Sequence, residues 1–424
     1  MKAIIKPGFL HGTIRVPASK SMMQRACAAA LLHKGITVIR NSGFSDDEQA
    51  AMEIIQQLGA TLLSKNQKEI VVQSQGVSPK SSIIHCGESG LAARLFIPIA
   101  ALSNHEIRVE GSGSLLQRPM QEFVSVLPQL CVQLKHQNNC LPFELKGPMQ
   151  PKEIKVDGSM SSQFLSGLLF AFSFAASEDV TIKVHSLKSK PYIDLTLQIL
   201  ELFGKKIPHN NYETFHINPS NFIAKEKIEI DIEADWSSAS CWLVGAIING
   251  NISVENLNEQ SLQADKNILS AIEAATEKSI NSLNKLSLQP LSYFRFDATD
   301  CPDLFPILAV MAGCAKGTSS IKGLHRLTHK ESNRKNVIIE MLQHLGVQSE
   351  VVDDSLEIHG RRFFEGATIN AYNDHRIVMA ASIAALKAKS SITILGAEAV
   401  SKSYPNFFQH LVSLGVECTL SSDA

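Results

Sequence analysis

A helical segment recurs about every 70 residues along this chain of 424 residues. In each copy, small or polar turn residues precede a run rich in Ala, Leu and other apolar residues. Ser and Asp favour the N-cap position of a helix, and a helix that is apolar on most faces is a buried one. The six copies begin at Ser19, Ser89, Ser161, Ser237, Asp303 and Asp374.

A second series of helical segments, amphipathic rather than apolar, lies between the members of the first. Ile193, Leu197 and Leu200, for example, follow the i, i+4, i+7 spacing of one helix face. Short runs typical of β-strands surround both series. Glycine is favoured just past a helix end, so glycines predict where four of these segments stop. They are Gly59, Gly204, Gly346 and Gly415.

The two series together predict a unit, repeated six times, in which strands alternate with one buried and one amphipathic helix. The alternative is chance spacing in an ordinary α/β protein, and the agreement of two independent series favours the repeat. Six buried helices are too many to pack around one axis. We therefore expect two groups of three, with a cleft between them. Helix N-termini facing that cleft would carry partial positive charge and free N–H groups.

The overall charge of the chain does not reveal an anion site. Lys and Arg number 40 and Asp and Glu 41, which gives a net charge of −1, and aromatic residues make up 6%. A dedicated nucleic-acid binder would carry a basic excess. A long disordered chain would combine low hydrophobicity with high net charge, whereas 44% of this chain is hydrophobic. A site for a small anion must therefore come from local clustering of basic side chains.

Motifs for metal binding and membrane insertion are missing from the sequence. The eight cysteines are scattered without a CxxC pair, and there is no HExxH or phosphate-loop lysine motif. The N-terminal segment has no apolar stretch long enough for a signal peptide, and the longest apolar run, residues 164–176, is too short to span a bilayer. We expect a cytoplasmic globular protein with no metal, no cofactor, and no nucleic-acid or membrane partner.

Hydroxyl and basic side chains gather at the predicted helix starts. Taken singly, each serine is most simply a helix cap, each Lys or Arg a solvated charge, and each acid a cap or a first-turn residue stabilised by the helix dipole. The joint pattern instead indicates a site for phosphate and carboxylate groups. The positions are Lys20, Ser21, Arg25, Arg94, Arg118, Ser161, Ser162, Gln163, Lys190, Tyr192, Lys330, Glu331, Arg334, Arg376 and Lys402.

The motifs that contain these positions resemble those of the 5-enolpyruvylshikimate-3-phosphate synthase family. They occur in the same order and at the same spacing as in that family. They are VPASKSMMQRACAAALL, GESGLAAR, QRPM, MSSQFLSGLL, SKPYIDLTL, ADWSSAS, CPDLFP, KESNR, YNDHRIVMA and SKSYPNFF. The resemblance implies an α/β fold of two pseudo-threefold domains, each of three βαβαββ units, the inside-out α/β barrel of enolpyruvyl transferases. It implies an inserted domain at 19–232 and a discontinuous domain at 1–18 plus 233–424.

The resemblance also implies a reaction. Enzymes of this family transfer the enolpyruvyl (1-carboxyvinyl) group of phosphoenolpyruvate to the 5-hydroxyl of shikimate 3-phosphate, in chorismate and aromatic amino acid biosynthesis. They release phosphate and use no cofactor. The methylene carbon is protonated while the hydroxyl attacks C2, and the tetrahedral intermediate then loses a proton and phosphate. This chemistry needs an acid, a base and strong anion binding. We expect a monomer whose partners are these two small-molecule substrates.

Site residues are carried over motif by motif. Asp303 would be the general base on the reacting hydroxyl, Glu331 the partner in proton transfer at the methylene carbon, and Lys20 a catalytic cation. At Gly90 a Cβ would crowd the phosphate, while the backbone N–H binds it. The expected shikimate 3-phosphate ligands are Lys20, Ser21, Arg25, Ser161, Ser162, Gln163, Ser189, Tyr192, Asp303 and Lys330. The expected phosphoenolpyruvate ligands are Lys20, Gly90, Arg118, Gln163, Arg334, Arg376 and Lys402.

The expected sites are divided between the domains. The discontinuous domain would carry the acid and base and part of the phosphoenolpyruvate site. The inserted domain would carry the shikimate 3-phosphate site and the rest of the phosphoenolpyruvate site.

The chain departs from the family pattern at four positions. Glu88 and Leu91 stand where the family usually has Asn and Thr, so an acid is introduced and a hydroxyl is lost. An acid at 88 requires a neighbouring Lys or Arg if it is to lie beside a site for polyanions. Asn333 stands where Asp is usual, and Arg326 stands where the family often has Asn.

Two other functions compete with this one. A sister transferase that acts on UDP-N-acetylglucosamine shares the fold, but it opens with a Gly-Ala-Lys-Asn type of segment and uses a loop cysteine as its acid. Here Ser21 follows Lys20, and no cysteine lies in the loop near Arg118. A non-catalytic binding protein on the same fold would have lost part of the acid/base pair or the arginines. Asp303 and Glu331 are both present.

Overall fold

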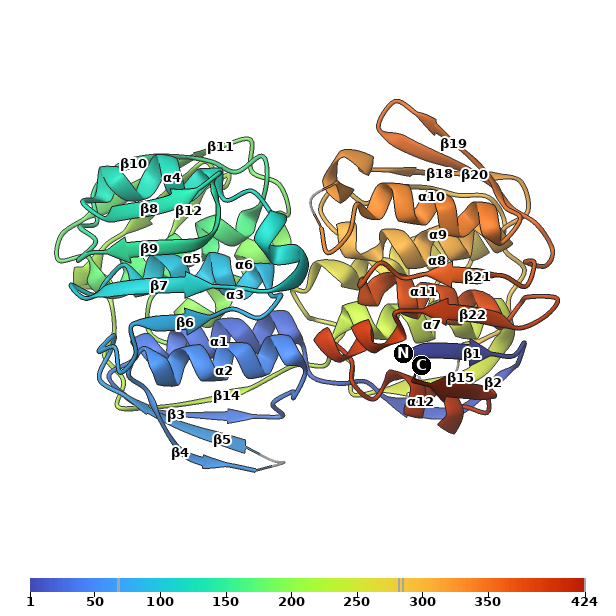
Figure 1. Cartoon of the computed structure of the whole chain (residues 1–424), viewed down its shortest axis with the longest axis horizontal. Helices are drawn as coiled ribbons and strands as arrows, with labels where there is room; N and C mark the ends of the chain where they lie inside the picture. Colours follow the sequence, from blue (N-terminus) through green and yellow to red (C-terminus); the bar gives the residue numbers. More distant parts are fainter. Residues whose placement is uncertain (67–68, 281–282, 284–285, 329, 423–424) are drawn as a thin grey trace. The chain divides into compact units, whose positions relative to one another are not determined.

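Six small β-sheets and two groups of buried helices make up the fold (Figure 1). The computed structural model describes residues 1–66, 69–280, 283, 286–328 and 330–422. Two compact units are present. Unit 1 comprises Met1–Pro17 and Ala234–Ala424, and unit 2 comprises Ala18–Glu233. The expected boundaries, 1–18 plus 233–424 and 19–232, lie one residue from these at each crossing.

Each sheet of unit 2 follows the same pairing rule. One strand pairs parallel with a second, the second pairs antiparallel with a third, and the third forms an antiparallel pair with the strand at the far edge. In pairing order, the sheets are β6 (Ile83–His85), β7 (Glu106–Glu110), β9 (Cys140–Lys146), β8 (Gln133–Gln137); β10 (Ile154–Asp157), β11 (Val180–His185), β13 (Thr214–Ile217), β12 (His209–Asn210); and β14 (Lys227–Asp231), β3 (Gly35–Arg40), β5 (Glu69–Ser74), β4 (Thr61–Lys65).

The sheets of unit 1 repeat the rule, with three strands described in the last of them. In pairing order they are β17 (Arg295–Asp297), β18 (Thr318–Lys322), β20 (Ser355–His359), β19 (Gln348–Val352); β21 (Thr368–Asn370), β22 (Ile392–Leu395), β1 (Lys2–Ile5), β23 (Cys418–Ser421); and β2 (Leu10–Arg15), β15 (Gly250–Glu255), β16 (Leu286–Ser287). The predicted α/β fold of two groups of three repeated units is confirmed.

Within each unit, three buried helices contact one another at the centre. Nearly all their side chains are buried, because the Ala- and Leu-rich runs leave no polar face to turn outward. In unit 2 they are α1 (Lys20–Leu32), α3 (Gly90–Ala100) and α5 (Ser162–Ala175). In unit 1 they are α7 (Trp236–Asn249), α9 (Phe305–Cys314) and α11 (His375–Ala385).

Four of the predicted helix starts are confirmed and two are shifted. Ser19, Ser89, Ser161 and Asp374 are N-caps whose side chains accept a backbone N–H. The fourth buried helix begins at Asp235 rather than Ser237, because the Asp235 carboxylate accepts the first free N–H groups of the helix. Asp303 lies in the 3-10 turn η5 (Pro302–Leu304) ahead of α9, whose N-cap is Leu304.

A second helix completes each repeat. The four predicted stop positions, Gly59, Gly204, Gly346 and Gly415, have φ values of 123°, 76°, 74° and 92°. Each follows the C-cap residue of its helix in the left-handed conformation that favours glycine, so these ends are confirmed. These second helices are α2 (Asp46–Gln57), α4 (Gln121–Val126), α6 (Lys190–Leu202), α8 (Ile268–Thr276), α10 (Arg334–His344) and α12 (Phe407–Ser413).

Candidate active site

The start of α1 carries the first of the expected site residues in unit 2. Lys20, the first residue of the helix, forms an ion pair with Asp47 in the first turn of α2, with Nζ to Oδ2 at 2.7 Å. Both side chains are largely buried, at 14% and 10% exposure. The structure therefore supplies an acidic partner for Lys20 that the sequence pattern did not reveal.

Arg25, one turn further along α1, is a fully buried cation held by neutral oxygens. Its Nε donates to Thr196 Oγ1 at 2.8 Å, its Nη1 to the Ser21 carbonyl at 2.9 Å, and its Nη2 to the Tyr192 carbonyl at 3.3 Å. Burial lowers the pKa of Arg25 to about 10, so the side chain remains charged at neutral pH. A buried guanidinium among neutral groups suits an anionic ligand.

Thr196 joins the three helices that carry the expected shikimate 3-phosphate ligands of unit 2. Its hydroxyl lies 2.8 Å from Arg25 Nε on α1 and 2.9 Å from the Ser166 hydroxyl on α5, and it donates to the Tyr192 carbonyl on α6 at 2.9 Å. The network therefore fixes α1, α5 and α6 to one another. Thr196 and Ser166 are buried in helix interiors and were missed by an argument based on helix starts.

The serines and the glutamine of this group occupy the starts of α5 and α6. Ser161 caps α5 by accepting the Gln163 N–H at 3.2 Å, and Ser162, the first residue of α5, is buried. Ser189 is the N-cap of α6 and has a φ of 56°, a left-handed conformation that is uncommon for serine. Its conformation is a local cost of the kind often found at functional positions.

Two guanidinium groups lie beside Gly90 at the start of α3. A Cβ on Gly90 would lie 2.6 Å from Arg118 Nη1 and 3.1 Å from Arg94 Nη1. Arg94 also pairs with Glu122, with Nε to Oε1 at 3.4 Å, and donates to the Gly90 carbonyl. The glycine was expected to leave room for a phosphate. In the structure, the group that a side chain at position 90 would displace is the guanidinium of Arg118.

In unit 1, one guanidinium joins the expected acid and base. Arg334 Nη1 lies 2.8 Å from Asp303 Oδ1, and its Nη2 lies 2.5 Å from Glu331 Oε2. Lys330 Nζ lies 3.1 Å from the same Asp303 oxygen. Burial acts to raise the pKa of Asp303, but the charges of Lys330, Arg334 and Arg376 outweigh it and hold that pKa well below its ordinary value.

Asp374 is a functional candidate that the sequence argument missed as a site residue. It is fully buried, caps α11 by accepting the Arg376 N–H at 3.0 Å, and accepts the Ser332 hydroxyl at 3.0 Å. It also binds Arg334 through two oxygens. Burial acts to lower the pKa of Arg334, and the carboxylates of Asp374, Glu331 and Asp303 raise it above its usual range. The position of Asp374 in the NDHR motif was the sequence signal that could have identified it as a site residue.

Arg376, at the start of α11, is a buried cation, and the described part of the chain does not use all of its N–H donors. It is 6% exposed, and its Nε and Nη1 have no hydrogen-bond partner among the described residues. Burial acts to lower its pKa, and the nearby carboxylates of Asp303, Asp235 and Asp265 raise it. Lys402, in the 3-10 turn η7 (Ala397–Lys402), donates to the Asn373 carbonyl at 2.7 Å.

Asp265 is a second acid that the sequence argument missed. It lies in the 3-10 turn η4 (Ala264–Asn267), is 1% exposed, and accepts the Ser237 hydroxyl through Oδ2, while its Oδ1 is buried without a hydrogen-bond partner among the described residues. Burial, with help from the charge of Asp303, raises its pKa to about 7. No motif signalled this residue, because its environment is created by tertiary packing.

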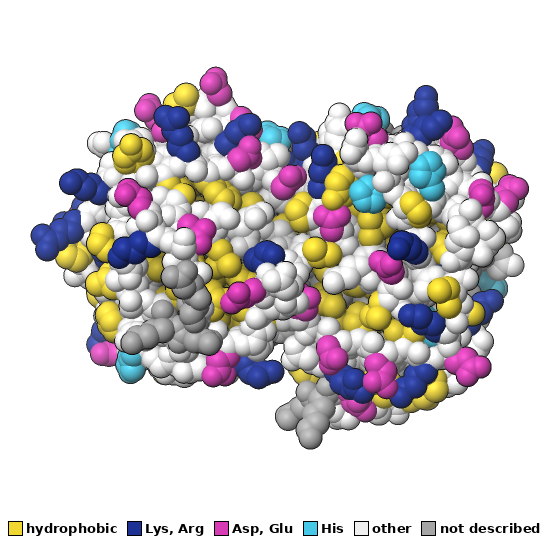
Figure 2. Space-filling model, turned by 180° about the vertical axis from the view of Figure 1, so that it is seen from behind, with side chains coloured by type: hydrophobic (Ala, Val, Ile, Leu, Met, Phe, Trp, Pro, Cys, Tyr) yellow, Lys and Arg dark blue, Asp and Glu magenta, His cyan; other side chains and the backbone are white. Residues whose placement is uncertain are grey.

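The expected residues divide between the two units, and each unit brings some of them into contact: Arg25 with Ser21 and Tyr192 in unit 2, and Arg334 with Asp303 and Glu331 in unit 1. Buried guanidinium groups supply much of the positive charge in both. On the face seen in Figure 2, acidic and basic side chains are interspersed. Unit 2 carries Lys20, Ser21, Arg25, Gly90, Arg118, Ser161, Ser162, Gln163, Ser189 and Tyr192. Unit 1 carries Asp303, Lys330, Glu331, Arg334, Arg376 and Lys402.

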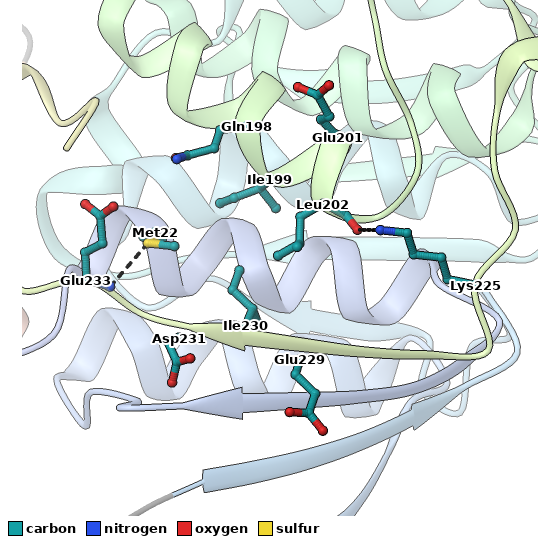
Figure 3. A pocket seen from close by; sticks show the side chains of 10 residues that line it. All are labelled: Met22, Gln198, Ile199, Glu201, Leu202, Lys225, Glu229, Ile230, Asp231 and Glu233. Carbon is teal, nitrogen blue, oxygen red and sulfur yellow. Dashed lines mark hydrogen bonds between the residues drawn. The ribbon is translucent and has the colours of Figure 1, made fainter. Parts of the chain in front are cut away.

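A pocket of about 550 Å³ in unit 2 lies apart from these ligands (Figure 3). Carboxylates stand around an apolar floor, and Lys225 donates to the Leu202 carbonyl at 2.7 Å. None of the expected site residues lines it. Its lining is Met22, Gln198, Ile199, Glu201, Leu202, Lys225, Glu229, Ile230, Asp231 and Glu233.

Two features, a metal-binding cluster and a membrane-spanning helix, are absent from the described part of the chain. No group of three or more His, Cys, Asp and Glu side chains is arranged to hold a metal ion. No helix is long and apolar enough to cross a membrane.

Solved structures with the same fold are enolpyruvyl transferases. The EPSP synthase of Acinetobacter baumannii superposes with a TM-score of 0.80 at 24% identity, over 99% of this chain and 100% of that one. The enolpyruvyl transferase NikO of Streptomyces tendae superposes with a TM-score of 0.77 at 16% identity, over 100% of this chain and 99% of that one. These likenesses define the class of fold.

Sequence comparison then identifies the family. The family model of EPSP synthase (3-phosphoshikimate 1-carboxyvinyltransferase) matches residues 4–411. The 3-phosphoshikimate 1-carboxyvinyltransferase of Clostridium acetobutylicum is 35% identical over 97% of this chain and 96% of its own length. That of Clostridium perfringens strain SM101 is 33% identical over 97% and 98%. The chain belongs to the EPSP synthase family, a family of enzymes.

Proposed function

We propose that this protein transfers the enolpyruvyl group of phosphoenolpyruvate to the 5-hydroxyl of shikimate 3-phosphate and releases phosphate. One observation carries the proposal beyond family membership. A single guanidinium, that of Arg334, contacts both Asp303 and Glu331, the two carboxyl groups needed for proton transfer. A base and an acid fixed to one buried cation can act on neighbouring atoms of one substrate pair.

Shikimate 3-phosphate binds mainly to unit 2 in this proposal. Arg25 receives the ring carboxylate together with the Ser21 hydroxyl, since its charge is buried among neutral groups. The phosphate is bound by hydroxyls and N–H groups at the starts of α5 and α6, with Lys330 beside it. The remaining ligands are Lys20, Ser161, Ser162, Gln163, Ser189, Tyr192 and Asp303.

Phosphoenolpyruvate is bound mainly by cationic side chains in this proposal. Arg376 is the strongest candidate, because two of its nitrogens are buried without hydrogen-bond partners among the described residues. Arg118 lies against Gly90 at the start of α3, where the backbone N–H groups also attract an anion. Lys20, Gln163, Arg334 and Lys402 complete the set.

The reaction proceeds by addition and elimination. The 5-hydroxyl gives its proton to Asp303 as its oxygen attacks C2 of phosphoenolpyruvate, and the methylene carbon takes a proton from Glu331. In the second step the methyl group of the tetrahedral intermediate returns a proton to Glu331, the C2–O bond to the phosphate breaks, and the departing phosphate takes up the proton held by Asp303. Lys20, Arg334 and Arg376 stabilise the charge that develops on the oxygens.

The ion pairs of Asp303 give substrate binding a part in catalysis. In the structure, Lys330 and Arg334 hold the pKa of Asp303 low, although burial acts in the opposite direction. A carboxylate with a low pKa is a weak base. When Lys330 turns to the incoming phosphate, Asp303 loses one of its two salt-bridge partners and becomes more basic.

Purified protein tests the proposal directly. We expect phosphate release only when shikimate 3-phosphate and phosphoenolpyruvate are both present. Asp303→Ala and Glu331→Ala should each lower kcat by about 10²–10⁴-fold while the folded far-UV spectrum is retained. Glu350→Ala, an exposed acid on β19, is the control. Release with UDP-N-acetylglucosamine instead, or wild-type rates in both site variants, would contradict the proposal.

We also propose that the enzyme works as a monomer in the cytoplasm. All eight cysteines are free thiols, as is usual in a reducing compartment. Sedimentation equilibrium at micromolar protein and fractionation of the producing cells test the two statements.

A further inference from the structure

The carboxylate of Glu88 lies over the turn that leads to Arg118. This turn is the 3-10 segment η1 (Gly113–Gln117), and Arg118 is its C-cap residue. The Ser114 N–H donates to Glu88 Oε2 at 3.4 Å. Gly113 has a φ of 53°, and a Cβ there would collide with the Glu88 carboxylate. The close approach of carboxylate and turn therefore requires glycine at 113.

A second hydrogen bond links the same turn to the guanidinium. Arg118 Nη2 donates to Ser114 Oγ at 3.3 Å. Ser114 thus receives Arg118 through its side chain and binds Glu88 through its backbone. The backbone supports the arrangement, because the Ser112 N–H donates to the Gly87 carbonyl at 2.8 Å.

Arg118 has little freedom in the resulting arrangement. It is 7% exposed, and its Nη1 lies 2.6 Å from the position that a Cβ of Gly90 would take. One side of the guanidinium is therefore set by the start of α3, and the other by Ser114. Glu88 immediately precedes Ser89, the N-cap of α3. The residues just before α3 therefore contact both the start of this helix and, through Ser114, the turn that leads to Arg118.

We propose that Glu88 is a positioning residue for Arg118, which it holds toward phosphoenolpyruvate through Ser114. The inference rests on the proposed function, in which Arg118 binds that substrate. It gives a structural role to the acid that stands where the family usually has Asn. Glu88 acts by accepting a hydrogen bond, so its acceptor oxygen matters more than its charge.

Steady-state kinetics of four variants test the inference. Glu88→Ala and Ser114→Ala each remove one link, and we expect each to raise KM for phosphoenolpyruvate by about 3- to 10-fold, the effect of one lost hydrogen bond. KM for shikimate 3-phosphate should change less than twofold. Glu88→Gln keeps an acceptor oxygen and should restore most of the affinity. Glu144→Ala, which removes a half-buried acid on β9 of the same unit that pairs with Arg108, is the matched control.

The double variant Glu88→Ala/Ser114→Ala adds a test of coupling. If Glu88 acts on Arg118 only through Ser114, the KM of the double variant for phosphoenolpyruvate should not exceed the higher of the two single-variant values. Three results would overturn the positioning role: an unchanged or lower KM for phosphoenolpyruvate in Glu88→Ala, an equal rise in KM for both substrates, or failure of Glu88→Gln to restore affinity. Wild-type protein without two-substrate phosphate release would instead contradict the proposed function.

Discussion

Arg334 and Asp374 form a two-point ion pair in the interior of unit 1, with Nε to Oδ2 at 2.9 Å and Nη2 to Oδ1 at 3.2 Å. Side-chain exposure is 1% for Arg334 and 0% for Asp374. This planar pairing fixes the orientation of the guanidinium that also contacts Asp303 and Glu331. Asp374 therefore sets the geometry of the proposed acid/base pair without touching either carboxyl group.

Removing Asp374 should cost stability as well as activity. Asp374→Ala leaves the buried charge of Arg334 with fewer partners and removes the cap of α11. We expect a loss of about 3–5 kcal/mol in the free energy of unfolding, measured by urea denaturation. Asp374→Asn keeps a side-chain acceptor for the cap and should lose less. A loss below about 1 kcal/mol in Asp374→Ala would show that the pair contributes little.

Asp265 makes stability depend on pH in a direction opposite to that of most carboxylates. Burial raises its pKa to about 7 from an ordinary value of 3.8, so the folded protein binds more protons than the unfolded chain between these two values. Stability contributed by this group is greatest below pH 4 and is lost as the pH rises through about 7.

The neutral isostere at this position tests that effect. Asp265→Asn cannot ionise, so its free energy of unfolding relative to wild type, measured by urea denaturation, should be greater at pH 8 than at pH 5 by on the order of a few kcal/mol. Asp353→Asn, an exposed acid in the same unit, controls for the change of residue type. Equal differences at the two pH values would mean that Asp265 is ionised throughout.

Lys330 should control the acid limb of the activity profile. Its ammonium is 3.1 Å from Asp303, whose pKa it lowers against the opposing effect of burial. In Lys330→Met that charge is gone, so the pKa of Asp303 rises toward its ordinary range. The acid limb of kcat/KM against pH should then move to higher pH. A profile unchanged in position, with only its height reduced, would assign the limb to another group.

Thr196 should affect one substrate selectively. Thr196→Val keeps the shape of the side chain but leaves the buried Nε of Arg25 without its hydroxyl partner. We expect KM for shikimate 3-phosphate to rise by about 3- to 10-fold and KM for phosphoenolpyruvate to stay within a factor of two. Ser173→Ala, which changes a buried serine on the neighbouring helix α5, is the matched control. A parallel rise in both KM values would indicate general distortion of unit 2.

Local signals made much of the fold predictable. The glycine after a helix, such as Gly204, requires only the conformation of its own backbone, and the caps Ser19 and Ser89 bind N–H groups three residues away. Such features are written in a few adjacent residues. Their repetition along the chain was enough to predict six units and two groups of buried helices.

Long-range contacts set the limit of prediction at the site. The partners Lys20 and Asp47 are on different helices, and Arg334 and Asp374 belong to different repeats. Nothing local to Asp265 shows that packing will bury its carboxylate beside Asp303. The roles carried over from the family for Asp303, Glu331 and Arg376 stay predictions until the kinetics are measured.

The placement of β1 joins segments that are synthesised at very different times. This strand, Lys2–Ile5, lies between β22 and β23, which are the last two strands of the chain. Because synthesis runs from the N-terminus to the C-terminus, β1 is made long before β22 and β23, the two strands with which it pairs. Residues 18–233 have no such dependence, because their three sheets use only strands from that stretch. Unit 2 can therefore fold on the nascent chain, whereas unit 1 closes only after β23 has been synthesised.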